Sequence, residues 1–149
     1  MGWLARLKEW LTRNPVGQVD DEVLGPLVLN DGDADGYWVA RATAQGRPVL
    51  FLIGGRYEPD PALIARARDI FGSLDRFVAD VTAFLAAEAE QKHWTPFADE
   101  IRALTIQDIC LFWPSRPDEG MIFFAGTNPD LCWRCHLNGR TPVGLNFDS

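Results

Sequence analysis

One short run near the carboxyl end holds the side chains best suited to chemistry: Cys132, Trp133, Arg134, Cys135 and His136. This run matches C-x-x-C-H, the attachment pattern of c-type haem, in which two thiols bond to the haem vinyl groups and the imidazole binds iron. In a strand, residues at this spacing project to opposite faces, so we expect Cys132 and Cys135 to point apart. A thioredoxin-type disulfide is disfavoured too, because its first cysteine needs a helix N-terminus.

The same residues are also candidate zinc ligands. Cys132, Cys135 and His136 could combine with Cys110 and His93. Zinc sites usually contain two paired cysteine knuckles, whereas this chain has one pair and scattered single ligands. In the simpler interpretation Cys110 and one cysteine of the pair are small core side chains, His136 is solvated and His93 lies near a helix C-terminus. We predict no cofactor, and a metal- or redox-active protein using Cys132, Cys135 and His136 is the alternative function.

An acidic turn is the second group of candidate ligands. Asp31, Asp33 and Asp35 alternate along residues 31–36 and match the first half of an EF-hand calcium loop. The twelfth position of such a loop should be a bidentate Glu, but Ala42 occupies it, and the flanking residues have strand patterns rather than helical ones. We prefer an acidic hairpin turn to a calcium site as the explanation of this run, because Asp and Gly tolerate the backbone angles of tight loops.

Other catalytic signatures are absent from the sequence. It contains no P-loop, no G-x-S-x-G, no H-E-x-x-H and no Rossmann glycine fingerprint. His93 and His136 are the only histidines, and neither has a neighbour that suggests a general base. We therefore nominate no catalytic residue and favour a protein that is not an enzyme, with a small enzyme of unknown class as the least favoured alternative.

Composition indicates an acidic globular protein. The chain has 149 residues, 47% hydrophobic and 23% charged, which predicts a single domain over residues 1–149 and excludes a disordered chain. The 14 Lys and Arg against 21 Asp and Glu give a net charge of −7, which argues against nucleic acid as a partner. No apolar run has the length of a transmembrane segment. An odd number of cysteines and the lack of a secretory signal predict a cytoplasmic protein with reduced thiols.

The first 14 residues predict a short amphipathic helix. Its apolar residues have helical spacing: Trp3, Leu4, Leu7, Trp10 and Leu11. Asn14-Pro15 ends the pattern. The helix could dock on its own domain, bind a partner or a second copy as a homodimer, or lie on a membrane surface. We prefer docking on its own domain, because so short a helix interrupted by Arg6, Lys8 and Arg13 would hold a membrane only weakly.

The rest of the chain, residues 21–149, combines strand and helix patterns. The predicted strands are 23–29, 37–44, 48–53, 106–113, 121–125, 131–137 and 140–147. Short links predict that the first three pair antiparallel, and Asn138-Gly139 is a strong hairpin signal between the last two. The continuous apolar run 48–53 predicts a strand covered on both faces.

Helical periodicity follows the first three strands. Asp60-Pro61 marks the start of a helix over 61–72, and Ser73 caps a second helix over 74–92. A shorter helix is predicted over 95–104. The predicted fold class is α+β: a single domain with a mostly antiparallel sheet, on which an αα-hairpin and the short N-terminal amphipathic helix pack.

The C-terminal residues resemble the ending of a group of small bacterial proteins. The similar run is Trp133-Arg134-Cys135 followed by residues 138–149, NGRTPVGLNFDS. These uncharacterised proteins end in a W-R-C hairpin and P-x-G-L-x-F-D-S, and some are similar to immunity proteins that neutralise secreted bacterial toxins. The resemblance implies a terminal hairpin rather than a haem site, and it implies no catalytic residue.

Acidity, the resemblance and the lack of catalytic motifs together predict a non-enzymatic protein-binding module. An immunity-type inhibitor of a bacterial toxin, or an accessory factor, fits this description. An acidic surface would steer a basic partner to fast association. The candidate contact residues are all acidic: Asp31, Asp33, Asp35, Glu88, Glu90, Asp99 and Glu100.

Overall fold

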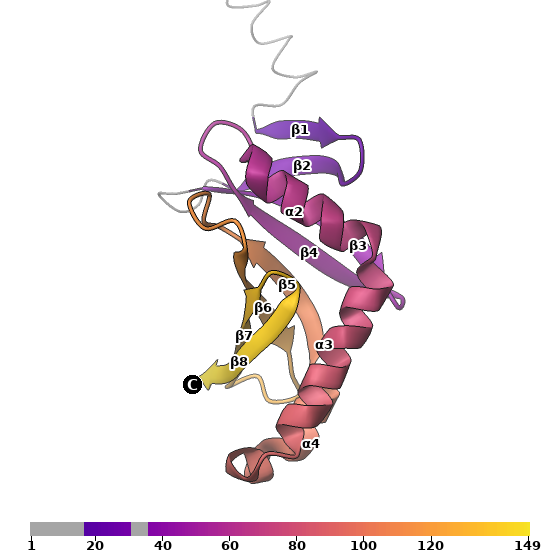
Figure 1. Ribbon diagram of the computed structural model, residues 1–149, viewed down its shortest axis with the longest axis vertical. Coiled ribbons are helices and arrows are strands. Elements are labelled where there is room, and N and C mark those ends of the chain that lie inside the picture. Colours follow the sequence, from indigo (N-terminus) through magenta and orange to yellow (C-terminus); the bar gives the residue numbers. More distant parts are fainter. Residues whose placement is uncertain (1–16, 31–35) are drawn as a thin grey trace, which may run out of the picture.

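Strands follow one another across a single sheet in the order of the sequence. A computed structural model describes residues 17–30 and 36–149, and in this part of the chain the sheet has eight strands (Figure 1). Their bounds are β1 (Gln18–Asp21), β2 (Gly25–Asn30), β3 (Tyr37–Ala44), β4 (Arg47–Gly54), β5 (Thr105–Leu111), β6 (Glu119–Ala125), β7 (Cys132–Asn138) and β8 (Thr141–Asp148).

The sheet is mixed, so the predicted fold class with a mostly antiparallel sheet is wrong. Antiparallel pairs connect β1 through β4, and a second antiparallel series connects β5 through β8. The two series meet at the centre, where β4 and β5 are parallel. A parallel pair needs a long crossover connection, and here the crossover contains every helix that the structure describes.

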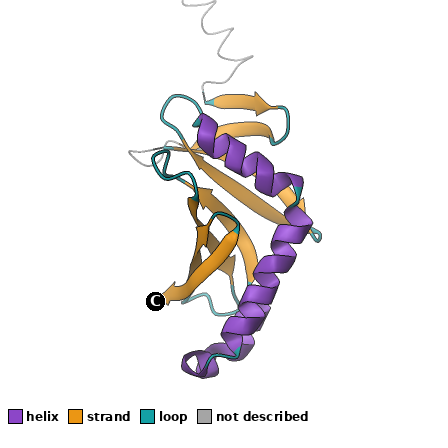
Figure 2. Cartoon of the chain, viewed as in Figure 1, coloured by secondary structure: helices purple, strands orange, loops and turns teal. Residues whose placement is uncertain are grey.

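The crossover runs through α2 (Pro61–Gly72), α3 (Leu74–Ala89), η1 (Lys92–Phe97) and α4 (Ala98–Ala103). Asp60 caps α2 as predicted, because its side chain accepts hydrogen bonds from the amides of Ala62 at 3.0 Å and Leu63 at 3.2 Å. Only Ser73 separates α2 from α3. One residue is too short to reverse the chain, and α3 leads onward from the end of α2 (Figure 2). The predicted αα-hairpin is therefore wrong.

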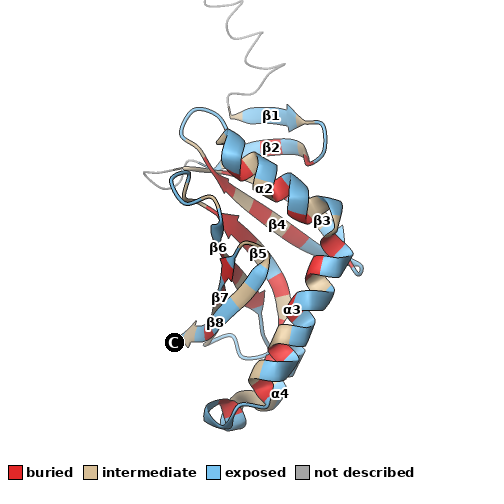
Figure 3. Ribbon diagram, viewed as in Figure 1, coloured by how far each residue is buried: buried red, intermediate tan, exposed pale blue. Residues whose placement is uncertain are grey.

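The helices pack on one face of the sheet and build the main core there. α2 contacts β4 and β5, while α3 contacts β3 and the edge strand β8, so the sheet curves around the helices. The largest fully buried side chains of this core include Trp38, Phe51, Phe77 and Trp133. Along β4, buried residues alternate with half-buried ones, which shows that the core takes every second side chain (Figure 3).

The C-terminal hairpin is confirmed, whereas the first strand was missed. β7 and β8 pair antiparallel, and Gly139 has the positive φ of 63° that the turn requires. The strand predicted over 23–29 begins at Gly25, since the Asp21 side chain accepts the amides of Val23 at 3.0 Å and Leu24 at 2.8 Å in a preceding turn. The predicted N-terminal helix lies outside the described residues. None of the described helices is long and apolar enough to cross a bilayer.

Candidate functional site

The cysteine and histidine side chains of β7 divide between the two faces of the sheet, as predicted. Cys132 and His136 are exposed, whereas Cys135 is fully buried in the core on the opposite face. Burial raises the pKa of Cys135 to about 12, so its thiol stays protonated. Cys110 is buried on β5 and His93 is exposed in η1. In the described residues no three His, Cys, Asp or Glu side chains gather closely enough to hold a metal ion.

The predicted acidic contact residues are only partly free to meet a partner. Asp31, Asp33 and Asp35 lie outside the described residues. The others lie between the end of α3 and α4, at the far end of the molecule from β1 (Figure 1): Glu88, Glu90, Asp99 and Glu100.

Two of these four carboxylates hold the chain's own structure. Glu88 accepts a hydrogen bond from Trp94 Nε1 at 3.1 Å, and Glu100 accepts one from the Asn128 amide at 3.2 Å. Asp99 lies 3.7 Å from Arg102 but is fully exposed, and Glu90 is exposed as well. The last two are therefore the carboxylates of this group that could steer a partner.

The second face of the sheet is not covered by the described helices. Residues that pair across neighbouring strands project to the same side, so the strand register defines which side chains share this face. One row crosses β2 to β8: Val28, Val39, Leu52, Cys110, Met121, His136 and Val143. A second row crosses β3 to β8: Arg41, Leu50, Asp108, Phe123, Arg134 and Asn146. We call these two rows the open face.

The centre of the open face is apolar and its ends are polar or exposed. Its apolar side chains are half-buried and do not belong to the main core: Val39, Leu50, Leu52, Met121 and Phe123. Cys110 lies among them and is, within the described chain, the one buried hydrophobic side chain outside the core. At the two ends of its row, Val28 is 52% and Val143 is 42% exposed. The open face thus carries an apolar cluster of its own.

A carboxylate lies in the middle of this apolar cluster. Asp108 pairs in register with Leu50 on one side and Phe123 on the other. Burial raises the pKa of Asp108, because its charged form loses contact with water. Arg134, two strands away, pairs instead with Asp148 at the sheet edge. No described residue forms an ion pair with Asp108.

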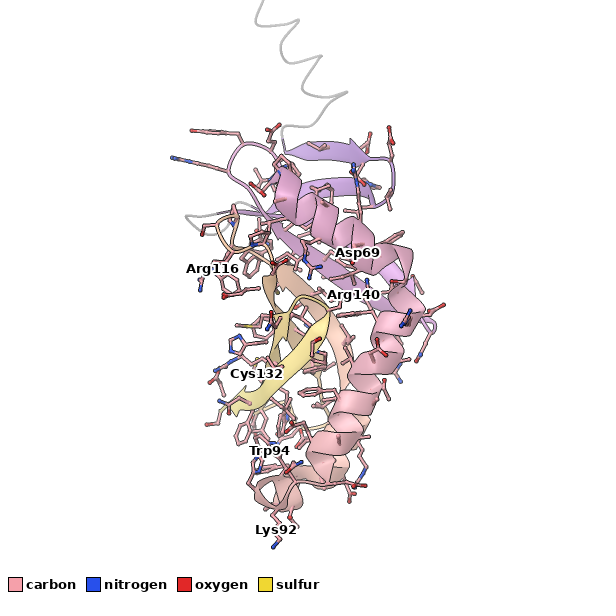
Figure 4. All side chains as sticks on the ribbon, viewed as in Figure 1. Asp69, Lys92, Trp94, Arg116, Cys132 and Arg140 are labelled. Atoms are coloured by element: carbon pink, nitrogen blue, oxygen red, sulfur yellow. The ribbon has the colours of Figure 1, made fainter. Side chains whose placement is uncertain are left out.

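Aromatic rings and arginines extend the open face beyond the ends of β4 and β5. The rings of Tyr37 and Phe112 lie 5.7 Å apart, and they meet across β4 because the residue paired with Tyr37 is Gly54. Phe112 also contacts the ring of Trp113 at 6.3 Å, and the guanidinium of Arg116 (labelled in Figure 4) stacks over Trp113 at 5.3 Å from the ring centre. Tyr, Trp and Arg are the residues that most often dominate the binding energy of protein interfaces.

Sequence reasoning missed the open face because it read apolar residues on both sides of a strand as burial on both sides. The run 48–53 has apolar residues at every position, but the helices cover only the side that carries Phe51 and Ile53. The opposite side, with Leu50 and Leu52, stays only partly buried. One signal could have revealed the open face. The predicted helices are enough to cover only one face of the sheet, so the other face has to remain without a helical layer.

Comparison with known proteins adds no relative. No family model matches the chain, and neither the curated proteins nor the solved structures give a match. The similarity of the C-terminal run to small bacterial proteins therefore stays a prediction.

Proposed function

We propose that this chain is a non-enzymatic protein-binding module that receives a partner protein on its open face. The observation that carries the proposal is the apolar cluster around Leu52, Met121 and Phe123, which is only partly buried and separate from the core. Contiguous exposed apolar surface marks interaction sites, and protein interfaces combine an apolar centre with a polar rim. Arg41 and Asn146 at the ends of the second row, with His136 and Arg134 on β7, supply such a rim.

The chemistry of the open face favours a basic partner. A lysine or arginine of the partner that reached Asp108 would meet a carboxylate already surrounded by apolar side chains, where a charge pair is only weakly screened by water. The net charge of −7, together with the exposed Glu90 and Asp99, would attract such a partner from a distance. An immunity-type inhibitor of a basic bacterial toxin is the specific form of this proposal, and an accessory factor is the general one.

The three cysteines support a cytoplasmic site of action. Each of them, Cys110, Cys132 and Cys135, is a free thiol. Free thiols persist in a reducing compartment, whereas secreted proteins of this size tend to form disulfides. We therefore place the encounter with the partner in the cytoplasm.

The test is capture of the partner by the full chain and by matched variants. Tagged wild-type chain is expressed in its native cells, a stoichiometric partner is identified, and binding is repeated with the purified partner. Phe123→Asp places a charge on the open face, and Ala79→Asp places the same charge on an exposed position of α3. We expect the partner to be retained by wild type and Ala79→Asp and lost by Phe123→Asp. Absence of a stoichiometric partner, or equal retention by Phe123→Asp, would overturn the proposal.

A further inference from the structure

We propose that two copies of this chain pair through their open faces, about a twofold axis that runs along β4, when no other partner is bound. This inference rests on the open face that the proposed function uses. It names a second copy as the occupant of that face in the free protein, so a partner would have to displace it.

The second row of the open face carries two opposite charges in symmetrical positions. Arg41 on β3, Leu50 on β4 and Asp108 on β5 lie side by side in register. Arg41 and Asp108 therefore stand one strand to either side of β4, each at a spacing of about 4.8 Å from it. Neither side chain belongs to an ion pair within the described part of the chain. The row thus offers a second copy one cation and one carboxylate.

A twofold axis along β4 would place each of these charges opposite its complement. Rotation about a line parallel to the strands reverses the order of the strands and keeps each position along them, so β3 of one copy would face β5 of the other. Arg41 would then meet Asp108 of the second copy, and Asp108 would meet its Arg41. The open face is therefore self-complementary in charge, as the interface of a twofold dimer has to be.

Neighbouring axes are disfavoured by the same charges. The sheet curves around the helices, so a second copy would meet the open face at its middle strands, β4 and β5. An axis along β5 would place Asp108 opposite Asp108 of the second copy. An axis between β4 and β5 would place it opposite the apolar Leu50. Facing like charges, or burying a charge without a partner, costs free energy, and only the axis along β4 avoids both costs.

The axis along β4 also brings the apolar side chains of the first row together. Leu52 on β4 would face Leu52 of the second copy, and Val39 on β3 would face Cys110. Val28 on β2 would face Met121 on β6. Val28 is 52% exposed, the most of any apolar side chain in this row, so the dimer would cover the side chain that most needs cover.

A hollow over β2 and β3 offers room for a side chain of the second copy. Its volume is about 450 Å³, and its lining includes Pro26, Val28, Val39 and Arg41. In the proposed dimer β2 lies opposite β6, which carries Phe123 on its open face. Phe123 of each copy would thus lie over the hollow of the other. Aromatic side chains seated in pockets of the partner are typical anchors of protein interfaces.

Sedimentation of the purified full-length chain, with no partner present, measures this pairing. We expect wild type to have twice the mass of the 16.7 kDa chain and to dissociate on dilution. Arg41→Glu would place two carboxylates opposite each other, and Asp108→Lys would place two cations opposite each other. We expect each variant to dimerise about tenfold more weakly than wild type, or weaker still. Arg76→Glu is the matched control, because it reverses the same charge at an exposed position of α3, and it should dimerise as wild type does.

Mixing the two variants tests the contact itself. An Arg41→Glu chain that faces an Asp108→Lys chain has a glutamate against a lysine at one contact and an aspartate against an arginine at the other. The mixture should therefore form a heterodimer although each variant alone is monomeric. Circular dichroism establishes that both variants fold. Asp108→Asn, which removes a charge and adds none, should weaken the dimer in the same direction if Asp108→Lys does not fold.

Three results would overturn the inference. The first is a wild type that stays monomeric up to about 100 μM. The second is equal dimerisation of wild type and folded Arg41→Glu. The third is a mixture of the two folded variants that remains monomeric, because a dimer with another contact would not be restored by exchanged charges.

The outcome is separable from that of the partner test, because no partner takes part. A chain that captures a partner but stays monomeric loses this inference alone. A chain whose dimer depends on Arg41 and Asp108 as expected, but which captures no partner, loses the proposed function alone. Dilution separates the copies, so the contribution of Asp108 to the stability of the single chain is measured below the concentration at which they pair.

Discussion

Asp108 and Phe123 face each other as register partners on β5 and β6, with both side chains on the open face. Because burial raises the pKa of Asp108, its ionised form costs the folded protein stability. This contribution is most favourable below the ordinary aspartate pKa and is lost as the pH rises through the raised value. We predict that Asp108→Asn is more stable than wild type at pH 7 and equally stable at pH 3.

Urea unfolding at a series of pH values measures this difference. Asp80→Asn, an exposed position on α3, is the control and should follow the wild type throughout. The prediction fails if the difference between Asp108→Asn and wild type does not change with pH, since a residue without a shifted pKa would behave in that way.

Thiol reactivity should follow the alternation of β7. Cys132 is exposed, while burial raises the pKa of Cys135 to about 12 and also raises that of Cys110. We predict that iodoacetamide at pH 8 labels Cys132 alone in the folded protein and all 3 cysteines after denaturation, as measured by intact mass. Labelling of folded Cys132→Ser would contradict the burial of Cys110 and Cys135, and a disulfide between Cys132 and Cys135 would contradict the placement of these two sulfurs on opposite faces.

Arg140 connects the C-terminal hairpin to α2 through hydrogen bonds of its guanidinium. Its guanidinium lies 3.0 Å from the carboxylate of Asp69 and 2.6 Å from the Ser73 hydroxyl, and it stacks 5.8 Å from the ring centre of Phe77. We predict that Arg140→Ala lowers the free energy of unfolding by about 1–2 kcal/mol, because two charge-assisted hydrogen bonds are lost at a partly exposed site. Chemical denaturation checks this, with the exposed Arg76→Ala as control. If Arg140→Ala lowers the free energy of unfolding no more than Arg76→Ala does, the contacts of Arg140 contribute nothing to stability.

Trp133 lies at the centre of an aromatic cluster, and its ring nitrogen has no hydrogen-bond partner among the described residues. Its ring centre is 5.3 Å from that of Trp94 and 4.9 Å from that of Phe147. We predict that Trp133→Phe costs clearly less than Trp133→Ala, because it removes an unpaired N–H and leaves a smaller cavity than Ala does. Trp133→Ala should cost about 3–5 kcal/mol through the cavity it leaves. Equal losses in the two variants, by chemical denaturation, would contradict this.

Local patterns predicted most of the elements but not their arrangement. Asp60-Pro61 and Asn138-Gly139 act through backbone groups within a few residues, so the start of α2 and the last hairpin could be predicted from sequence. β1 could not, because Gln18–Asp21 contains a single apolar residue and pairs through its backbone. The parallel pairing of β4 with β5 depends on the path of the helical crossover, and no local signal records that path.

The open face could not be predicted from the sequence for a similar reason: it depends on tertiary structure. The division of Cys132 and Cys135 between two faces follows from the period of a strand, and it was predicted correctly. Which face the helices cover is a tertiary property, so the sequence could not distinguish Leu52 on the open face from Phe51 in the core. The acidic residues singled out by charge alone include Glu88 and Glu100, which hold the chain's own structure.

The central claim is that the open face binds a protein partner, and the affinity of the purified partner for face variants tests it most directly. Calorimetry with wild type, Phe123→Asp and Ala79→Asp should give at least a tenfold weaker affinity for Phe123→Asp, which is about 1.4 kcal/mol, and no change for Ala79→Asp. Equal affinity of all three chains, with each variant folded as wild type by circular dichroism, would contradict the account.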